Sequence, residues 1–321
     1  MPAHRKYPCD MATGISDVGF IGLGTMGFPM ANNLLKAGFR LVVHDLAQEP
    51  VARLAARGAR PVDSPRAVAQ ACPYVITMLP ASAHVQAVLD GENGTIAHMA
   101  AGGTLIEMST IDPSTTRALA ERATARGLRM IDAPVSGSSP KAQDGTLTIM
   151  VGGDAEVLDA CRPILDVLGT TIVHVGPIGS GETVKLVNNL IAAISMAAVA
   201  EAFNIGARHG LDPTVMYEVI RQSSGDCWSL RTRVPYSGVI PQSPANEDFA
   251  PGFMTDLMLK DVGLALAAAR AVDAPAELGA VAEQLYRSAH ALGYGRQDFS
   301  AVAQAIQAHN GPDREGDERR G

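Results

Sequence analysis

Six residues near the start of the chain have the spacing G-x-G-x-x-G, which is typical of a loop that binds phosphate groups. They are Gly22, Leu23, Gly24, Thr25, Met26 and Gly27. The loop follows an apolar run at 18–21 and precedes a helix-like segment that ends at Ala37. Glycines let the backbone approach a pyrophosphate closely, and the start of a helix offers N–H groups to its charge. The pattern predicts a dinucleotide site; the alternative is a turn that only connects a strand to a helix.

An acidic residue ends the next apolar run. Asp45 lies 23 residues after Gly22, where a carboxylate accepts hydrogen bonds from the ribose hydroxyls of adenosine. It would repel the 2′-phosphate of NADP, and no arginine follows it directly. The sequence therefore favours NAD as the cofactor, with Arg53 as a more distant phosphate partner. The alternative for Asp45 is a solvated strand end.

A lysine near the start of a long apolar segment is the second chemically unusual feature. Lys185 lies in the first turns of a helix predicted at 181–209, where the positive end of the helix dipole disfavours a cation. Asn189 follows four residues later, so both side chains project from one face. The pair is a candidate functional site; the alternative is a lysine that extends its charge to solvent.

The elements that position these residues alternate in type through the first half of the chain. Short apolar runs are followed by amphipathic stretches, the pattern of a parallel sheet with helices on its faces. We predict strands at residues 18–21, 41–44, 75–79, 105–108, 130–133, 147–151 and 172–175. Helices are predicted to begin after Asp112 and Asp154, because each precedes helix-forming residues as an N-cap does. The fold class is α/β, with a Rossmann-type doubly wound parallel sheet domain followed by an all-α C-terminal domain.

The pattern changes after Gly176, where alanine-rich helical segments replace the strands and continue to about residue 310. We predict a flexible leader at 1–16, a NAD-binding domain at 17–177, an all-α substrate and dimerisation domain at 178–310, and a flexible tail at 311–321. Met1 and Met11 both stay open as the start of translation. The helix at 181–209 has apolar residues on nearly every face, so we expect it to be buried all round.

Composition excludes several classes of protein. The 321 residues carry a formal net charge of −7, which disfavours nucleic-acid and anionic-membrane partners. The longest apolar run, 190–200, is shorter than the ~20 residues of a membrane span, and no secretory signal is recognisable. The four cysteines have no C-x-x-C spacing, which argues against zinc and disulfides. We expect a cytoplasmic protein without a metal site.

Motifs along residues 17–306 resemble those of the β-hydroxyacid dehydrogenase family, most closely its 3-hydroxyisobutyrate dehydrogenase branch. In the first half they are Phe20-Ile-Gly-Leu-Gly-Thr-Met-Gly27, Thr77-Met-Leu-Pro80, Ser109-Thr-Ile-Asp-Pro113, Asp132-Ala-Pro-Val-Ser-Gly137 and Gly145-Thr-Leu-Thr-Ile-Met-Val-Gly-Gly153. In the second half they are Lys185-Leu-Val-Asn-Asn189, Ser223-Ser-Gly-Asp-Cys-Trp-Ser229, Pro251-Gly-Phe253, Lys260-Asp261 and Asp298-Phe-Ser300.

The resemblance implies one set of residues that binds the cofactor and another that binds the substrate. Leu79, Pro80, His84, Thr110 and Lys260 would join the glycine loop and Asp45 around the cofactor. Ser136 and Gly137 would hold the substrate carboxylate, with Asn189, Trp228 and Asp261 as further substrate residues. Lys185 would be the general acid/base that handles the hydroxyl proton. Trp228, the only tryptophan, could cap a methyl group of the substrate or belong to the core.

The expected function is the NAD-dependent oxidation of 3-hydroxyisobutyrate to methylmalonate semialdehyde in valine catabolism. Ser138 and Lys141 stand where many family members have glycine, and 140–145 looks more like the tartronate semialdehyde reductases. Reduction of tartronate semialdehyde or another short β-semialdehyde acid is therefore the alternative. A non-catalytic NAD-binding protein is less consistent with Lys185, Asn189 and Ser136 together. The apolar second half is a plausible surface for a homodimer or homotetramer.

Overall fold

The structure is a computed structural model that describes residues 17–311. The predicted leader at 1–16 and the predicted tail beyond Gly311 lie outside the described residues. The chain divides into two compact units, one ending at Val187 and the other beginning at Asn188. The division falls inside helix α9 (Ser180–Arg208), after the predicted domain boundary at residue 177. The first turns of α9, with Lys185, therefore belong to the sheet unit, and Asn189 belongs to the helical unit.

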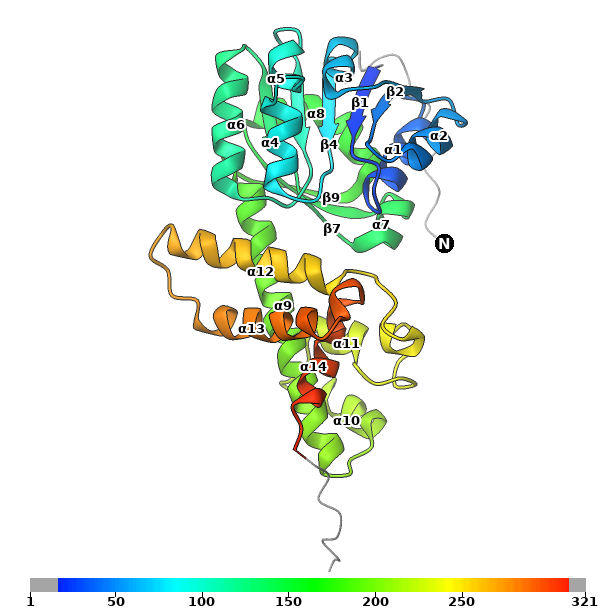
Figure 1. The fold of residues 1–321 in the computed structure, drawn as a ribbon, viewed down its shortest axis with the longest axis vertical. Coiled ribbons are helices and arrows are strands. Elements are labelled where there is room, and N and C mark those ends of the chain that lie inside the picture. Colours follow the sequence, from blue (N-terminus) through cyan, green and yellow to red (C-terminus); the bar gives the residue numbers. More distant parts are fainter. Residues whose placement is uncertain (1–16, 312–321) are drawn as a thin grey trace, which may run out of the picture. The chain divides into compact units, whose positions relative to one another are not determined.

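The first unit is built on a mostly parallel sheet (Figure 1). Its strands are β1 (Asp17–Ile21), β2 (Arg40–His44), β3 (Arg60–Pro61), β4 (Tyr74–Thr77), β5 (Thr104–Glu107), β6 (Arg129–Asp132), β7 (Val135–Ser136), β8 (Leu147–Gly152) and β9 (Gly169–Gly176). The order is β3-β2-β1-β4-β5-β6-β8-β7, and β9 pairs with β8. Because β1 lies between β2 and β4, the chain changes direction across the sheet at the glycine loop. Ligands of such sheets bind at this switch point, outside the carboxyl ends of the strands.

The predicted strands are confirmed, with two corrections. β8 runs antiparallel to both β6 and β7, so the sheet is parallel only from β3 to β6 and between β8 and β9. The two-residue strands β3 and β7 were not predicted, because two residues are too short to show an alternating pattern. β7 places Ser136 opposite Thr148 of the neighbouring strand.

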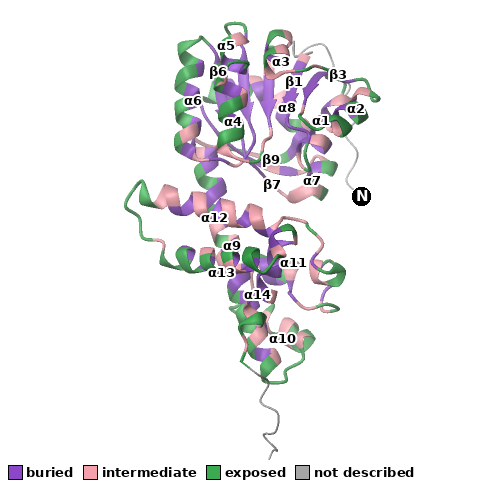
Figure 2. Cartoon of the chain, in the orientation of Figure 1, coloured by how far each residue is buried: buried purple, intermediate pink, exposed green. Residues whose placement is uncertain are grey.

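Helices cover both faces of the sheet, and an apolar core lies between the sheet and the helices on each face. Figure 2 shows the strands as buried between these helices. One core contains residues of α1 (Gly27–Lys36), α2 (Gln48–Ala55), α7 (Ser138–Asp144) and α8 (Ala155–Leu168). The other contains residues of α3 (Pro65–Ala71), α4 (Ser82–Asp90), α5 (Thr95–His98) and α6 (Pro113–Ala125). The predicted N-cap of α6 is confirmed, because the Asp112 carboxylate accepts a hydrogen bond from Ser114 N–H at 2.7 Å.

The second unit is entirely helical among the described residues. After α9 come α10 (Pro213–Ile220), α11 (Trp228–Arg233), α12 (Thr255–Arg270), α13 (Glu277–Ala291) and α14 (Val302–Ala308). Short 3₁₀ helices lie at η2 (Pro244–Glu247), η3 (Tyr294–Arg296) and η4 (Phe299–Ala301). Met196, Phe203, Tyr286 and Phe299 are among the side chains of its core.

The prediction that α9 is buried all round is wrong. Val187, Ile191 and Ile205 are 53, 62 and 60% exposed, so the residues that the structure describes leave part of this helix uncovered. By length and composition alone, α9 is also the one described helix that could cross a membrane, with 39% of its most apolar window buried. Core helices of soluble proteins meet the same criterion. The composition of the helix could not show which of its apolar residues are exposed, because apolar residues occur on nearly every face.

Candidate active site

The three glycines of the loop after β1 are each required for a different reason. Gly22 has φ +97°, and a Cβ there would meet the carbonyl oxygen of Met78. A Cβ on Gly27 would meet the carbonyl oxygen of Gly22, so this glycine lets α1 pack close to the loop. A Cβ on Gly24 would meet nothing within 4 Å. Gly24 thus borders open space at the start of a helix, which is where a dinucleotide pyrophosphate approaches the backbone.

The start of α1 is available to an anion. Its N-cap residue, Met26, makes no side-chain capping bond, and the first turn holds no acidic residue. Phe28 N–H donates to the Gly24 carbonyl at 3.0 Å, whereas the N–H groups of Thr25 and Met26, just before the helix, donate no hydrogen bond within residues 17–311 and remain for an incoming charge. A cavity of about 570 Å³ opens beside the turn, with Gly24, Thr25 and Arg53 in its lining. These residues fit a dinucleotide, because the site offers both open space and N–H donors.

Asp45 faces the glycine loop. Its carboxylate accepts hydrogen bonds from Leu23 N–H at 2.5 Å and from Ala47 N–H at 2.7 Å, one on each oxygen. Each oxygen keeps a second lone pair that a ribose hydroxyl can use. Arg53 is engaged elsewhere: its guanidinium lies 4.3 Å from the Phe28 ring centroid and 3.2 Å from the Glu49 carboxylate. The geometry agrees with the expectation that Asp45 is the ribose residue.

The other cofactor residues predicted in the sheet unit follow neighbouring strands. Leu79 and Pro80 come after β4, and Thr110 comes after β5, which pairs with β4. Leu79 N–H donates to Ser109 Oγ at 2.8 Å and joins the two loops. His84 is exposed on the first turn of α4. Leu79, Pro80 and Thr110 therefore lie at the sheet edge where the glycine loop also lies.

The residues predicted to bind the substrate carboxylate lie in a strained turn. Ser136 ends β7 and is half-buried, and Gly137 has φ +143°, with Lys141 Cβ and Leu147 where its own Cβ would be. Ser138 has φ +54°, a conformation that costs a residue with a Cβ. Its hydroxyl donates to the Gly137 carbonyl at 2.7 Å. Two successive residues with positive φ are consistent with a turn built for a ligand.

Buried carboxyl groups anchor the start of α9. The Asp132 carboxylate accepts from Gly179 N–H at 2.7 Å and from Glu182 N–H at 2.9 Å. Glu182 in turn accepts from Ile111 N–H at 3.2 Å, and Glu107 is buried on β5. All three carboxyl groups are 0% exposed, and burial raises the pKa of each. Sequence reasoning missed them as a group; the only available signal was that Asp132 opens a recognised motif.

Lys185 and Asn189 lie one helical turn apart on α9, as predicted. Lys185 is only 7% exposed, which is unusual for a lysine. Asn189 is 5% exposed, and its Nδ2 donates to Asp261 Oδ2 at 2.5 Å. Asp261 on α12 is 2% exposed and lies 3.0 Å from Lys260 Nζ. Asp261 therefore contacts two of the predicted site residues, Asn189 by a hydrogen bond and Lys260 by an ion pair. These contacts fix the position of the Asn189 amide.

Trp228 opens α11 and is not a core residue. It is 55% exposed, and its ring stacks on Phe299 at 6.5 Å between centroids with 6° between planes. One face of the ring is therefore held by the helical core while the residue remains accessible, as an apolar contact for a ligand requires. No group of three or more His, Cys, Asp or Glu side chains within residues 17–311 could hold a metal ion.

Comparisons with known proteins agree with this arrangement. Residues 17–176 match the NAD-binding domain of 6-phosphogluconate dehydrogenase, and residues 179–306 match the NAD-binding domain of NADP-dependent 3-hydroxyisobutyrate dehydrogenase. A 3-hydroxyisobutyrate dehydrogenase of Pseudomonas aeruginosa is 45% identical over 299 residues, which cover 93% of this chain and 96% of that protein. The chain belongs to the 3-hydroxyisobutyrate dehydrogenase family. It is an NAD-dependent dehydrogenase that acts on the CH–OH group of a hydroxy acid.

Two further relatives bear on the substrate. An NAD-dependent L-serine dehydrogenase of the same bacterium is 44% identical over 297 residues, covering 92% of this chain and 100% of that protein. The structure of Mycobacterium tuberculosis 3-hydroxyisobutyrate dehydrogenase with L-serine has a TM-score of 0.86 at 36% identity, covering 91% of this chain and 99% of that one. The family is therefore settled, while its members differ in the hydroxy acid that they oxidise.

Proposed function

We propose that this enzyme oxidises 3-hydroxyisobutyrate to methylmalonate semialdehyde with NAD, a step of valine catabolism. The observation that carries the proposal is the nearly buried Lys185, one turn before an Asn189 that Asp261 holds in place. A lysine so placed, beside a fixed amide, can exchange a proton with a bound hydroxyl. The 45% identity to a 3-hydroxyisobutyrate dehydrogenase supports this substrate.

The reaction assigns a role to each predicted residue. The glycine loop, Asp45 and the loops after β4 and β5 would hold NAD, which would supply the acceptor for the hydride that leaves C3 of the substrate. The Lys185 amine accepts the hydroxyl proton as the C–O bond becomes a carbonyl, and Asn189 orients that oxygen. Ser136 and Gly137 bind the substrate carboxylate through the hydroxyl and backbone N–H groups. Trp228 would contact the methyl group of the substrate, and Lys260 is the residue that the resemblance assigns to the nicotinamide.

L-serine is the second candidate substrate, because a 44% identical relative is an L-serine dehydrogenase. Serine and 3-hydroxyisobutyrate both carry the reacting CH₂OH group next to the carbon that bears the carboxylate. They differ in one C2 substituent, an ammonium or a methyl group. Tartronate semialdehyde, suggested by the segment 140–145, would be reduced by the reverse reaction.

A second copy of this chain is the expected partner. Val184, Val187 and Ile191 are 39, 53 and 62% exposed at helical spacing on α9, and an apolar stripe of this kind marks an interaction surface. The same stripe on a second copy would cover it in a homodimer, which could pair again into a homotetramer. Light scattering tests this: a particle containing one chain contradicts it.

We also propose that the protein is located in the cytoplasm. Its described cysteines, Cys72, Cys161 and Cys227, are free thiols, which suits a reducing compartment.

A panel of short hydroxy acids tests the proposed substrate. NADH formation is followed with 3-hydroxyisobutyrate, L-serine and glycerate, and NADH consumption with tartronate semialdehyde, each also with the phosphorylated cofactor. We expect the highest kcat/KM for 3-hydroxyisobutyrate with NAD. A higher value for serine, or faster reduction of tartronate semialdehyde, would overturn the proposal.

A further inference from the structure

An arginine of the helical unit is held in an unusual setting. Arg233 ends α11, and its side chain is 11% exposed. The guanidinium carbon lies 4.8 Å from the Trp228 ring centroid and 5.3 Å from that of Phe299. An arginine stacked on aromatic rings gives up much of its water, and its direction is fixed by the rings.

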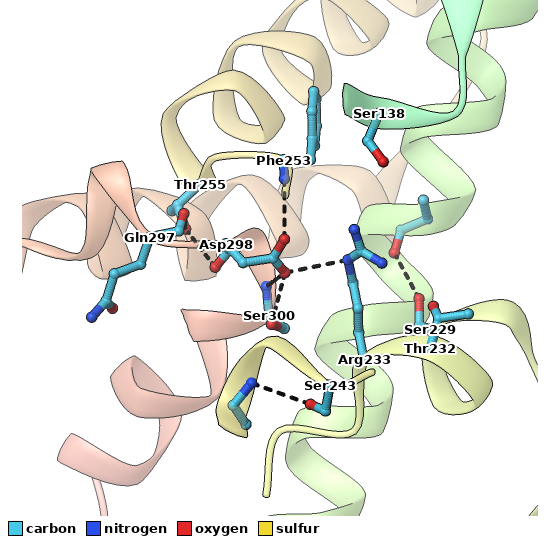
Figure 3. A network of polar contacts seen from close by, with 12 residues as sticks. Ser138, Ser229, Thr232, Arg233, Ser243, Phe253, Thr255, Gln297, Asp298 and Ser300 are labelled. Carbon is cyan, nitrogen blue, oxygen red and sulfur yellow. Dashed lines mark hydrogen bonds and ion pairs between the residues drawn. The ribbon is translucent and has the colours of Figure 1, made fainter. Parts of the chain in front are cut away.

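A buried carboxylate holds this arginine from one side. Asp298 is 0% exposed and accepts hydrogen bonds from Phe253 N–H at 3.1 Å, Ser300 N–H at 3.2 Å and the Ser300 hydroxyl at 2.8 Å (Figure 3). Arg233 Nε lies 3.3 Å from the same carboxylate but is buried without a well-aligned hydrogen bond. Donors of Phe253 and Ser300 thus satisfy most of the hydrogen-bonding capacity of the Asp298 carboxylate. Asp298 holds Arg233 mainly by charge attraction.

The two Nη atoms of Arg233 are the remaining donors of its guanidinium. Neither Nη atom of Arg233 donates a hydrogen bond within the part of the chain that the structure describes. A guanidinium presents five donors in a planar fork and favours anionic or oxygen-bearing partners. Arg233 therefore has donors to offer a ligand, in an orientation set by Trp228 and Asp298.

The position of Arg233 relates it to the substrate residues of the same unit. The Ser229 hydroxyl, one turn before Arg233 on α11, donates to the Ala192 carbonyl of α9 at 3.5 Å. Ala192 lies one turn after Asn189. We assign the Trp228 ring to the C2 substituent of the substrate. The guanidinium carbon of Arg233 lies 4.8 Å from the centroid of that ring. A group that meets Trp228 is therefore within the field of a cation.

We propose that Arg233 determines which C2 substituents the enzyme accepts: it favours neutral or oxygen-bearing groups and disfavours an ammonium. The inference rests on the proposed assignment of Trp228 to the substrate. An ammonium beside Trp228 would be repelled by the guanidinium, and the Asp298 carboxylate, 3.3 Å from Arg233 Nε, would offset only part of that repulsion. Arg233 is charged at every working pH, so the repulsion is permanent. The chain would then prefer 3-hydroxyisobutyrate and glycerate to L-serine.

L-Glycerate and L-serine form the matched pair for the test, because they differ only by a hydroxyl or an ammonium at C2. The quantity measured is the ratio of their kcat/KM values. We expect Arg233→Met to shift the ratio toward serine by on the order of tenfold or more. Arg233→Lys should keep most of the discrimination, and Arg231→Met should leave the ratio unchanged, since Arg231 is exposed and paired with Asp226.

Two additions keep the test decisive if Arg233→Met folds poorly. The double variant Arg233→Met with Asp298→Asn removes both charges and avoids an unpaired buried carboxylate. In the wild type, serine should gain on glycerate as the pH passes the pKa of the serine ammonium, because its charge is then lost.

The outcomes separate this inference from the proposed function. A ratio that changes less than about twofold in the arginine variants and stays flat with pH would overturn the role of Arg233. Poor oxidation of 3-hydroxyisobutyrate by the wild type would overturn the proposed function alone. A shifted ratio in that case would still support the charge selectivity of Arg233.

Discussion

The sheet unit and the helical unit hold their predicted site residues by different means. In the sheet unit, backbone geometry dominates: Gly22 and Gly27 lie where any Cβ would clash, and Gly24 borders open space. In the helical unit, side chains dominate, and two of them are held by buried carboxylates. Asp261 holds Asn189, and Asp298 holds Arg233.

This difference has a physical reason. A dinucleotide is common to many dehydrogenases, and backbone donors recognise its pyrophosphate whatever side chains surround them. A short hydroxy acid offers few atoms, so selectivity among such substrates must come from individual side chains. Substitutions in the glycine loop and at Asp45 should therefore affect cofactor binding, whereas those at the substrate side chains of the helical unit should change substrate selectivity. Lys185 lies at the end of the sheet unit, next to the division between the two.

The largest effect is expected at Lys185. Lys185→Met should lower turnover by about 10²- to 10⁴-fold, because it removes the group that exchanges the hydroxyl proton. NADH affinity, measured by fluorescence titration, should change little. Arg should not rescue activity, since a guanidinium cannot accept the proton. Turnover within a few-fold of the wild type would return Lys185 to a structural role.

The next effect is expected at Gly24, where a side chain would enter open space. Gly24→Val should weaken NADH binding by on the order of tenfold or more, because the added atoms occupy the path of the pyrophosphate. Thermal stability should be nearly unchanged, since nothing of the protein lies within 4 Å of that Cβ. Gly263→Ala is the control, because Gly263 also borders open space, but on α12. Unchanged NADH binding in Gly24→Val would place the cofactor elsewhere.

Asp45 tests cofactor choice. Asp45→Asn removes the charge that repels a 2′-phosphate and one of the two backbone hydrogen bonds that this side chain accepts, from Leu23 N–H and Ala47 N–H. We expect kcat/KM with NAD to fall by about tenfold and the gap between NAD and NADP to narrow. Asp63→Asn, at an exposed position after β3, should leave both values unchanged. A wild type that already prefers NADP would show that the role given to Asp45 is wrong.

The smallest effect concerns stability at Glu182. Burial and the neighbouring Glu107 raise the pKa of Glu182 well above its usual value. The folded chain therefore retains a proton that the unfolded chain loses above a pH of about 4.3. Stability is then fully present below that pH and decreases as the pH rises toward the pKa of the folded state.

Glu182→Gln removes this pH dependence, because an amide cannot ionise. At neutral pH it should raise Tm, by roughly 2 to 4 °C for each kcal/mol gained, in calorimetry across a pH series. Glu121→Gln, at an exposed position on α6, is the control. Parallel curves for the wild type and Glu182→Gln would contradict the expected pKa shift.

How much could be read from the sequence differed between the units. The strands, the glycine loop and Asp45 could be located because each has a local signature in spacing or periodicity. Asp298 and Arg233 are far apart in the chain and meet only in the fold, so no local pattern links them. The same holds for Asp132 and Glu182, whose partners are backbone groups of distant segments.

The exposed face of α9 could not be predicted for a different reason. An apolar residue such as Ile191 looks the same in the sequence whether it packs in the core or against a second molecule. Only the arrangement of the surrounding helices decides between the two. Motif order identified the family, but it did not determine the C2 substituent of the substrate.

The most direct test of the proposed function follows the hydrogen that leaves the substrate. 3-Hydroxyisobutyrate with two deuterium atoms on C3 is incubated with the enzyme and NAD, and the reduced cofactor is analysed by mass spectrometry. We predict one deuterium in each molecule of NADH formed, together with a semialdehyde that keeps the other. NADH without deuterium, or no NADH from this substrate while L-serine is oxidised, would contradict the account.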